Sequence, residues 1–192
     1  MKYILASQSP RRRELLGRLG IAFEIEPAEG EEVVYGEKPK EIVQNLAMAK
    51  AKEIAARHAG DTETVVIGAD TVVVCGNEIL GKPKDRQDMA VMIKKLQGRT
   101  HEVYTGVALC YEADDGPCCH SFAECTKVHF YAMNEEEIQT YAAQADGLDK
   151  AGGYGIQSDA SVYVRGIDGD YNNVVGLPVA RLYHEMKALR LI

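Results

Sequence analysis

An aspartate stands in the middle of a long apolar run of this chain. Asp70 follows residues 65–69 and precedes residues 71–74, and the run predicts a deeply buried β-strand. A carboxylate removed from water costs several kcal/mol, roughly, unless a cation, a metal ion or a set of hydrogen-bond donors compensates its charge. Asp70 is therefore either a structural residue satisfied by backbone amides or a group that faces a charged partner and takes part in chemistry.

Lys50 is one candidate for the charged partner. Apolar side chains recur at helical spacing from about Pro39 to His58, and at about 100° per residue Lys50 falls near the middle of that apolar face. Lys52 falls on the opposite side of the predicted helix. Lys50 therefore either extends along its stem to solvent or reaches a charged group in a cleft.

Lys82 is a second candidate. Residues 75–78 predict a tight hairpin turn after the Asp70 strand. A two-residue loop at 76–77 would bring Thr71 opposite Lys82, and Lys82 would then lie beside Asp70. A longer loop would shift this pairing, but either register leaves a cation within reach of the carboxylate.

The start of the chain is rich in positive charge. Residues 2–6 predict a short strand, and a helix follows from about Pro10 to Leu19, with Ser9 as its N-cap. A turn from strand to helix directs free amides at anions, and the arginines at 11, 12 and 13 stand at this helix start. The sequence alone leaves open which of these arginines contacts an anion, since exposed arginines are often simply solvated.

These features, together with the acidic segment EGEE at 29–32, predict a site for a metal ion and a phosphate group. Arginines, lysines and helix-start amides neutralise a nucleoside triphosphate, while carboxylates hold Mg²⁺ through oxygen ligands. Hydrolysis then requires a positioned water, a group that takes its proton, and stabilisation of the leaving pyrophosphate. The chain has neither the P-loop motif nor the Gly-x-Gly-x-x-Gly fingerprint, so neither a P-loop NTPase nor a Rossmann dehydrogenase is supported.

The bulk composition is that of an ordinary globular protein. The 192 residues favour a single domain, with 46% hydrophobic and 27% charged residues. A net charge of −7 disfavours a nucleic-acid partner, and the short apolar N-terminus followed by arginines predicts neither a signal peptide nor a membrane anchor. We therefore expect a cytoplasmic protein.

The five cysteines show no metal-binding spacing and are expected to be reduced thiols.

The rest of the chain predicts a scaffold and two polar loops. We expect helices at about 85–96, after Asn134 and at 178–189, the last burying Val179, Leu182, Tyr183 and Met186. Two β-segments at about 101–111 and 121–131 are expected to be joined by a polar loop at 114–117. The glycine-rich residues 149–157 and residues 166–178 are expected to be loops, which commonly line binding sites.

Several blocks of this sequence resemble, in order and over nearly the whole chain, the motifs of the Maf family. These are septum-formation proteins that are nucleoside triphosphate pyrophosphatases. The blocks are Ala6 to Leu16, with the sequence ASQSPRRRELL; GADTVV at 68–73; GKP at 81–83; DKAG at 149–152 with Ile156-Gln157; and DYNNVVGLP at 170–178.

The resemblance implies a mixed, elongated central α/β sheet with helices on both sides and two lobes around a nucleotide cleft, as in inosine triphosphatase-like enzymes. It implies a divalent metal, Mg²⁺ with Mn²⁺ or Co²⁺ as alternatives. Asp70 would be the general base or a metal-linked carboxylate, and Glu32, with Glu31 as an alternative, would help to bind the metal. The phosphates would be held by Arg12, Lys50 and Lys82.

The resemblance also bears on the substrate. Arg11, Thr71 and Gln157 resemble the base-specificity set of the subgroup that acts on dTTP and UTP, and Ser7 of the first motif block is expected to help bind the substrate. A 7-methyl-GTP pyrophosphatase, the first alternative, would carry glutamine in place of Thr71. The second alternative is a non-catalytic regulator of cell division. The resemblance further favours a homodimer.

Overall fold

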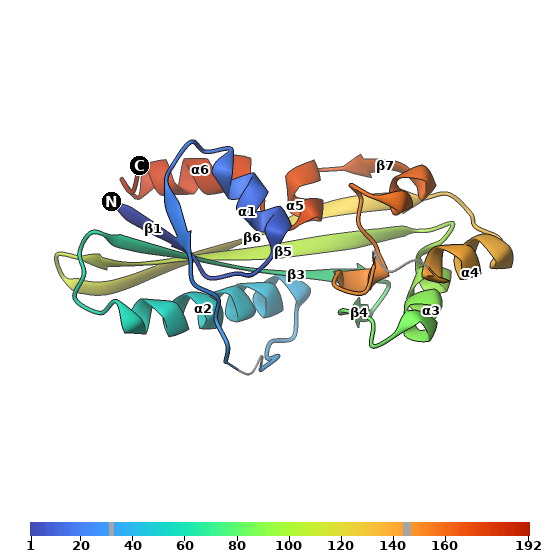
Figure 1. The fold of residues 1–192 in the computed structure, drawn as a ribbon, viewed down its shortest axis with the longest axis horizontal. Helices are drawn as coiled ribbons and strands as arrows, with labels where there is room; N and C mark the ends of the chain where they lie inside the picture. Colours follow the sequence, from blue (N-terminus) through green and yellow to red (C-terminus); the bar gives the residue numbers. More distant parts are fainter. Residues whose placement is uncertain (31–32, 144–146) are drawn as a thin grey trace. The chain divides into compact units, whose positions relative to one another are not determined.

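The apolar run around Asp70 forms strand β3 (Thr64–Cys75) in a computed structural model that describes residues 1–30, 33–143 and 147–192. Within these residues the strands form one mixed sheet of order β2-β1-β3-β5-β6-β7, with β4 paired to β3. Strand β1 (Lys2–Leu5) runs parallel to β2 (Phe23–Ile25) and to β3. The β3–β4 and β6–β7 pairs are antiparallel, so the expected mixed α/β fold is confirmed (Figure 1).

The chain packs into two compact units. Unit 1 comprises Met1–Asp70, Thr105–Glu124 and Gly176–Ile192, and unit 2 comprises Thr71–Tyr104 and Cys125–Val175. The boundary along β3 therefore falls directly after Asp70.

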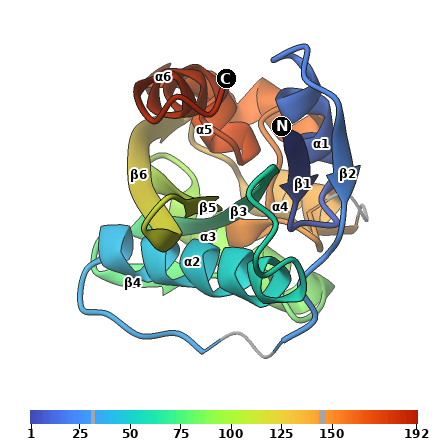
Figure 2. The ribbon, with the colours of Figure 1, turned by 90° about the vertical axis from the view of Figure 1, so that its left-hand side faces the viewer.

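Unit 1 has helices on both faces of its part of the sheet. Its helices are α1 (Pro10–Gly17), α2 (Pro39–Arg57) and α6 (Val179–Ala188). Helix α2 covers one face, and α1 and α6 cover the other (Figures 1 and 2). The core beneath α2 is built mostly from small and β-branched side chains: Ile4, Ala6, Ala47, Ala51, Ile54, Val66, Ala108 and Cys110. Small side chains allow α2 to lie close to the strands.

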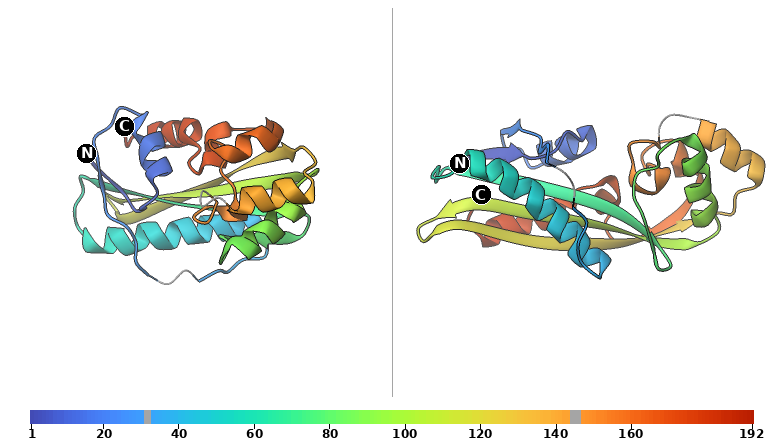
Figure 3. Two further views of the ribbon diagram at one scale, coloured as in Figure 1. Left: turned by 45° about the vertical axis from the view of Figure 1, so that its right-hand side comes forward. Right: turned by 90° about the horizontal axis from the view of Figure 1, so that it is seen from below.

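Unit 2 holds the remaining elements. They are β4 (Glu78–Leu80), α3 (Arg86–Leu96), α4 (Glu135–Ala143), the 3₁₀ turns η1 (Ala151–Gly153) and η2 (Asp159–Tyr163), β7 (Val164–Asp168) and α5 (Tyr171–Val175). Helix α3 packs against α4 and η1 (Figure 3). The strands β5 (Thr100–Ala113) and β6 (Gly116–Phe130) contribute residues to both units.

Residues 166–178 contain more regular structure than the loop that the sequence predicts. They include the end of β7 and helix α5, which begins after Gly169 at a backbone φ of +130°. The fully buried Asn173 anchors α5 by donating from Nδ2 to the Val103 carbonyl and to Thr126 Oγ1, each at 3.0 Å. Tyr183 of α6, expected to be buried, is 39% exposed.

The aromatic core of unit 2 contains a buried histidine. His101 is 1% exposed and packs edge-on against the rings of Phe130 and Tyr154. Its Nε2 is 2.7 Å from the Tyr154 hydroxyl, and among the described residues its Nδ1 has no hydrogen-bond partner. Burial lowers the pKa of His101 from 6.5 to about 4, with a smaller contribution from His129.

We predict that His101 makes the protein less stable in acid. Because its pKa is lower in the folded state, the unfolded chain binds more protons between the two pKa values. From about pH 7 to about pH 5, the free energy of unfolding should therefore fall by about 2 kcal/mol from this residue. Urea unfolding of His101→Phe should lack this component of the pH dependence, whereas the exposed His184→Gln should retain it. An unchanged slope in His101→Phe would contradict the prediction.

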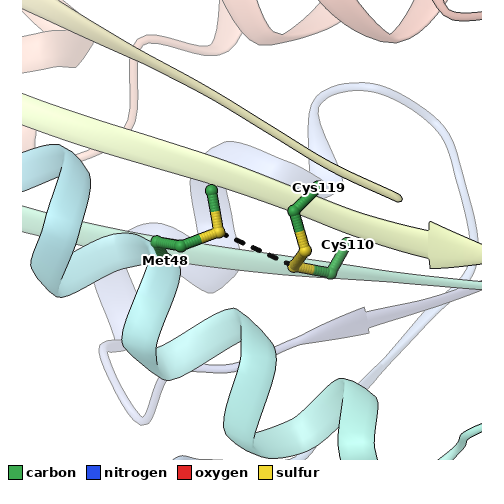
Figure 4. The surroundings of a disulfide bond; sticks show 3 residues. All are labelled: Met48, Cys110 and Cys119. Carbon is green, nitrogen blue, oxygen red and sulfur yellow. Dashed lines mark hydrogen bonds between the residues drawn. A yellow bond between two sulfur atoms is a disulfide. The ribbon is translucent and has the colours of Figure 1, made fainter. Parts of the chain in front are cut away.

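The expectation that all cysteines are reduced thiols is wrong for two of them. Cys110 of β5 and Cys119 of β6 form a disulfide with a Cα–Cα distance of 4.3 Å (Figure 4). The turn at 114–115 places them at equal distances along the two strands of the hairpin, so they lie directly opposite each other. Cys75, Cys118 and Cys125 are not in disulfides.

No helix among the described residues is both long and apolar enough to cross a membrane.

Candidate functional site

A buried ion pair joins the two residues that the sequence singled out first. Asp70 is 9% exposed, and Lys50 Nζ donates to its Oδ1 at 2.5 Å. The exposed fractions of the two side chains are 17% for Lys50 and 12% for Asp70. Of the alternatives for Asp70, compensation by a cation is therefore correct, and Lys50 reaches a charged partner instead of extending to solvent. Lys52 is exposed, as predicted.

The backbone of α2 lies very close to β3 at this pair. A Cβ atom built on Gly68 would lie 2.3 Å from the Ala47 carbonyl oxygen and 2.9 Å from the Ala51 nitrogen. Gly68 shares a strand face with Asp70, since side chains alternate along a strand. The absence of a side chain at Gly68 thus lets α2 approach closely enough for Lys50 to reach the carboxylate.

The turn from β1 to α1 is built around a second cation. The Ser9 side chain caps α1 by accepting from the Arg12 backbone N–H at 3.4 Å, as predicted. The Arg12 guanidinium donates from Nε to the Gly176 carbonyl at 2.9 Å and from Nη1 to Ser7 Oγ at 3.3 Å. Ser7 itself is 9% exposed. Arg12 is thus oriented by two partners of unit 1.

The neighbouring arginines differ in burial. Arg11 is half-buried, whereas Arg13 is exposed to solvent. Leu5 pairs with Ile67 and the Ala6 N–H donates to the Ile67 carbonyl, so the turn after β1 begins beside the middle of β3, three residues before Asp70. The strand-to-helix turn therefore leaves β1 at about the level along the sheet at which β3 carries Asp70.

Glu31 and Glu32 lie outside the described residues, so their role in metal binding stays a prediction. The residues before them are tied to α2 by Glu53, whose carboxylate accepts from the backbone N–H of Glu29 at 2.9 Å and of Gly30 at 3.0 Å. Sequence analysis missed this contact. The acidic segment therefore begins at a point fixed to the helix that carries the candidate lysine.

A small charged network reinforces this attachment. Arg57 donates to Glu53 at 2.9 Å and to Glu26 at 3.0 Å, and His58 lies 2.8 Å from Glu26. The N–H groups of residues 29 and 30, with Arg57, lower the pKa of Glu53, and His58 with Arg57 lowers the pKa of Glu26. Both carboxylates thus favour the charged form that accepts these bonds, and the network weakens as pH falls through the lowered pKa values. The i, i+4 spacing of Glu53 and Arg57 was the available sequence signal.

Three expected site residues belong to unit 2. The predicted hairpin forms with Cys75 opposite Glu78, but the ladder ends with Val73 opposite Leu80. The predicted register is therefore confirmed, but the ladder ends two residues before it reaches Thr71 and Lys82. Beyond Leu80 the Gly81 carbonyl accepts from Gly152 N–H at 2.9 Å, and residue 83 is proline, which cannot donate to a ladder.

The three side chains differ in exposure. Lys82 and Gln157 are exposed within unit 2, and Thr71 is half-buried. Gln157 follows the η1 turn, in which Gly152 and Gly153 take φ values of +70° and +75°. Both glycines pack tightly, since a Cβ would meet Val73 at 2.9 Å and Met89 at 2.9 Å, respectively. The glycine-rich motif therefore serves close packing within this unit.

A divalent metal fits this site in part. Among residues 1–30, 33–143 and 147–192 there is no group of three or more His, Cys, Asp or Glu side chains that could hold a metal. Mg²⁺ commonly takes one or two carboxylates and completes its shell with substrate phosphates and water. Asp70 is a buried carboxylate whose Oδ1 accepts from Lys50, and it can supply one such carboxylate ligand to Mg²⁺.

Fold and site together define a mixed-sheet α/β protein with a buried carboxylate–ammonium pair on one strand and an arginine-bearing strand-to-helix turn after the neighbouring parallel strand. The family model described as "Maf-like protein" matches residues 2–189. The chain therefore belongs to the Maf family, as its motifs indicated.

Curated relatives match the chain over nearly its whole length. A protein named dTTP/UTP pyrophosphatase from Agathobacter rectalis is 48% identical, over 97% of this chain and 96% of the relative. One of the same name from Carboxydothermus hydrogenoformans is 48% identical over 97% of this chain and 98% of the relative. A solved structure of a nucleoside-triphosphatase / dITP/XTP pyrophosphatase from Mycobacterium abscessus has a TM-score of 0.43 and 17% identity, covering 69% of this chain and 76% of that chain.

Proposed function

We propose that this chain is a cytoplasmic hydrolase that converts dTTP and UTP to the nucleoside monophosphate and pyrophosphate, with residues 1–192 acting as one catalytic domain. The observation that carries the proposal is the buried Lys50–Asp70 pair, since a carboxylate can accept a proton from water and the lysine holds this one in position. The names of relatives that are 48% identical over 97% of the chain support the substrate.

In the proposed reaction a water oxygen attacks the α-phosphorus. The bond from the α-phosphorus to the oxygen that bridges it to the β-phosphorus breaks, and pyrophosphate leaves. Asp70 accepts the water proton, and Lys50 holds the carboxylate in position. Arg12 and Lys82 provide positive charge for the triphosphate. Ser7 orients Arg12 through its hydroxyl.

A bound divalent cation, Mg²⁺ with Mn²⁺ or Co²⁺ as alternatives, would neutralise phosphate charge and polarise the scissile bond. Asp70 would supply one oxygen ligand, and Glu32, with Glu31 as the alternative, would supply another. Removal of metal with a chelator should therefore abolish pyrophosphate release, and Mg²⁺ should restore it.

The base would be selected by Arg11, Thr71 and Gln157. A panel of purified nucleotides, scored separately for pyrophosphate and orthophosphate, tests the proposal. Pyrophosphate release with dTTP and UTP as the best substrates would support it. Preference for 7-methyl-GTP would favour the first alternative, and no turnover of any nucleotide would favour a non-catalytic regulator of cell division.

Arg12 and Arg13 provide a matched test of phosphate binding. Because Ser7 and Gly176 orient Arg12, we predict that Arg12→Ala lowers kcat/KM for dTTP by more than about tenfold. The exposed Arg13→Ala should stay within about twofold of the parent. Pyrophosphate release at varied dTTP measures both. Equal losses in the two variants would mean that the arginines act through net charge alone.

A further inference from the structure

The Cys110–Cys119 disulfide is buried at one end and accessible at the other. Cys110 is 1% exposed, belongs to the apolar core under α2, and its Sγ lies 3.9 Å from Met48 Sδ (Figure 4). Cys119 is exposed on the partner strand of the hairpin. A reagent from solvent would therefore meet the sulfur of Cys119 first.

This disulfide borders a cavity of about 600 Å³ within unit 1. One wall of the cavity is formed by the C-terminal half of α2 and the residues that follow it, and the other wall by the tip of the β5–β6 hairpin. Both disulfide cysteines line the cavity. Small-molecule sites have about this volume, roughly 300–1,000 Å³. The nucleotide chemistry proposed above uses none of the lining residues.

The cavity wall carries charges of both signs. Lys52 and His58 line it together with Asp61 and Glu112. His58 faces Glu26, and Asp61 is held by the Thr64 hydroxyl at 2.7 Å and the Glu63 N–H at 3.0 Å. Such a wall suits a zwitterion, which brings a carboxylate for the lysine and an ammonium group for the acids, better than a neutral or a singly charged molecule.

We propose that this cavity is a thiol-exchange site, at which a zwitterionic thiol of amino-acid or short-peptide size modifies Cys119. The thiolate of the small molecule attacks Cys119 Sγ, the S–S bond to Cys110 breaks, and Cys110 leaves as a thiolate that takes up a proton. A second small thiol then attacks the mixed disulfide and releases the small-molecule disulfide. Protein disulfide and two thiols thus become protein dithiol and one small disulfide, and the reverse reaction re-forms the bond.

Single-cysteine variants of the full chain test which sulfur is modified. Treated with oxidised glutathione, Cys110→Ser should form a mixed disulfide at Cys119 that peptide mass mapping locates. Cys119→Ser should leave the buried Cys110 unmodified. Adduct formation at Cys110 instead of Cys119 would overturn the proposal. So would finding both cysteines as free thiols in the parent protein after equilibration with oxidised glutathione.

Lys52 tests the class of thiol. The rate of disulfide reduction by free cysteine, divided by the rate with neutral 2-mercaptoethanol, should fall by about threefold in Lys52→Ala, the size of one exposed ionic contact. Lys40→Ala is the matched control, since Lys40 is also exposed on α2 but does not line the cavity. An unchanged ratio in Lys52→Ala, or an equal fall in Lys40→Ala, would overturn the assignment of a zwitterionic thiol.

Discussion

Replacing Asp70 by asparagine is expected to lower kcat for pyrophosphate release from dTTP by about a thousandfold while the fold is retained. Asparagine has nearly the same shape as aspartate, and its amide oxygen can still accept from Lys50 Nζ, which now lies 2.5 Å from the carboxylate. The amide cannot take a proton from the attacking water, however. Steady-state kinetics with saturating Mg²⁺, together with a thermal melt, separate lost chemistry from lost structure.

Asp115→Asn is the matched control for this substitution. Asp115 is an exposed residue of the β5–β6 turn, so the same change of charge there should leave kcat within about twofold. Full activity of Asp70→Asn would remove Asp70 from the proposed mechanism. A large fall in melting temperature together with lost activity would instead assign Asp70 a structural role.

The Lys50–Asp70 pair shows how far local pattern alone can lead. Helical periodicity placed Lys50 on the buried face of α2, and the cost of burying a charge required a partner for Asp70. The first inference uses only the pattern of the helix and the second only that of the strand, and the observed ion pair confirms both. The choice between Lys50 and Lys82 as the partner depends on tertiary packing, which the periodicity of one element does not contain.

For the β3–β4 hairpin, the register was predicted correctly but the length of the ladder was not. The turn residues correctly set the register at Cys75 and Glu78, because a two-residue loop determines the first pairs of a hairpin. They do not determine where the ladder ends. Just beyond the last pair, the Gly81 carbonyl accepts from the Gly152 N–H, a contact between residues far apart in the sequence.

The disulfide could have been predicted by counting residues outward from the hairpin turn. Cys110 and Cys119 stand four residues before Asp114 and four after Asp115, which places them opposite each other if those two residues form the turn. The cysteine spacing matches neither a metal motif nor the disulfide framework of a small secreted protein, so by itself it does not indicate this bond. A cross-strand pair has no such motif and becomes visible only once the strand register is assigned.

Gly68 was visible as an isolated glycine in a run of β-branched residues, which often marks the close approach of another backbone. We predict that Gly68→Ala lowers the free energy of unfolding by at least about 3 kcal/mol, at the upper end of overpacking costs. The new Cβ would lie 2.3 Å from the Ala47 carbonyl oxygen, so α2 must move away from β3. Because α2 carries Lys50, the 2.5 Å contact with Asp70 should lengthen and activity should fall together with stability.

Urea unfolding of Gly17→Ala provides the control, because no atom lies within 4 Å of a Cβ at that helical glycine. That variant should be as stable as the parent or slightly more stable. Adding Ala51→Gly to Gly68→Ala should not restore stability, since the closest atom at Gly68 belongs to the backbone of α2. Recovery in the double variant would show that the Ala51 side chain, and not the helix backbone, determines how closely α2 approaches the strand that carries Asp70.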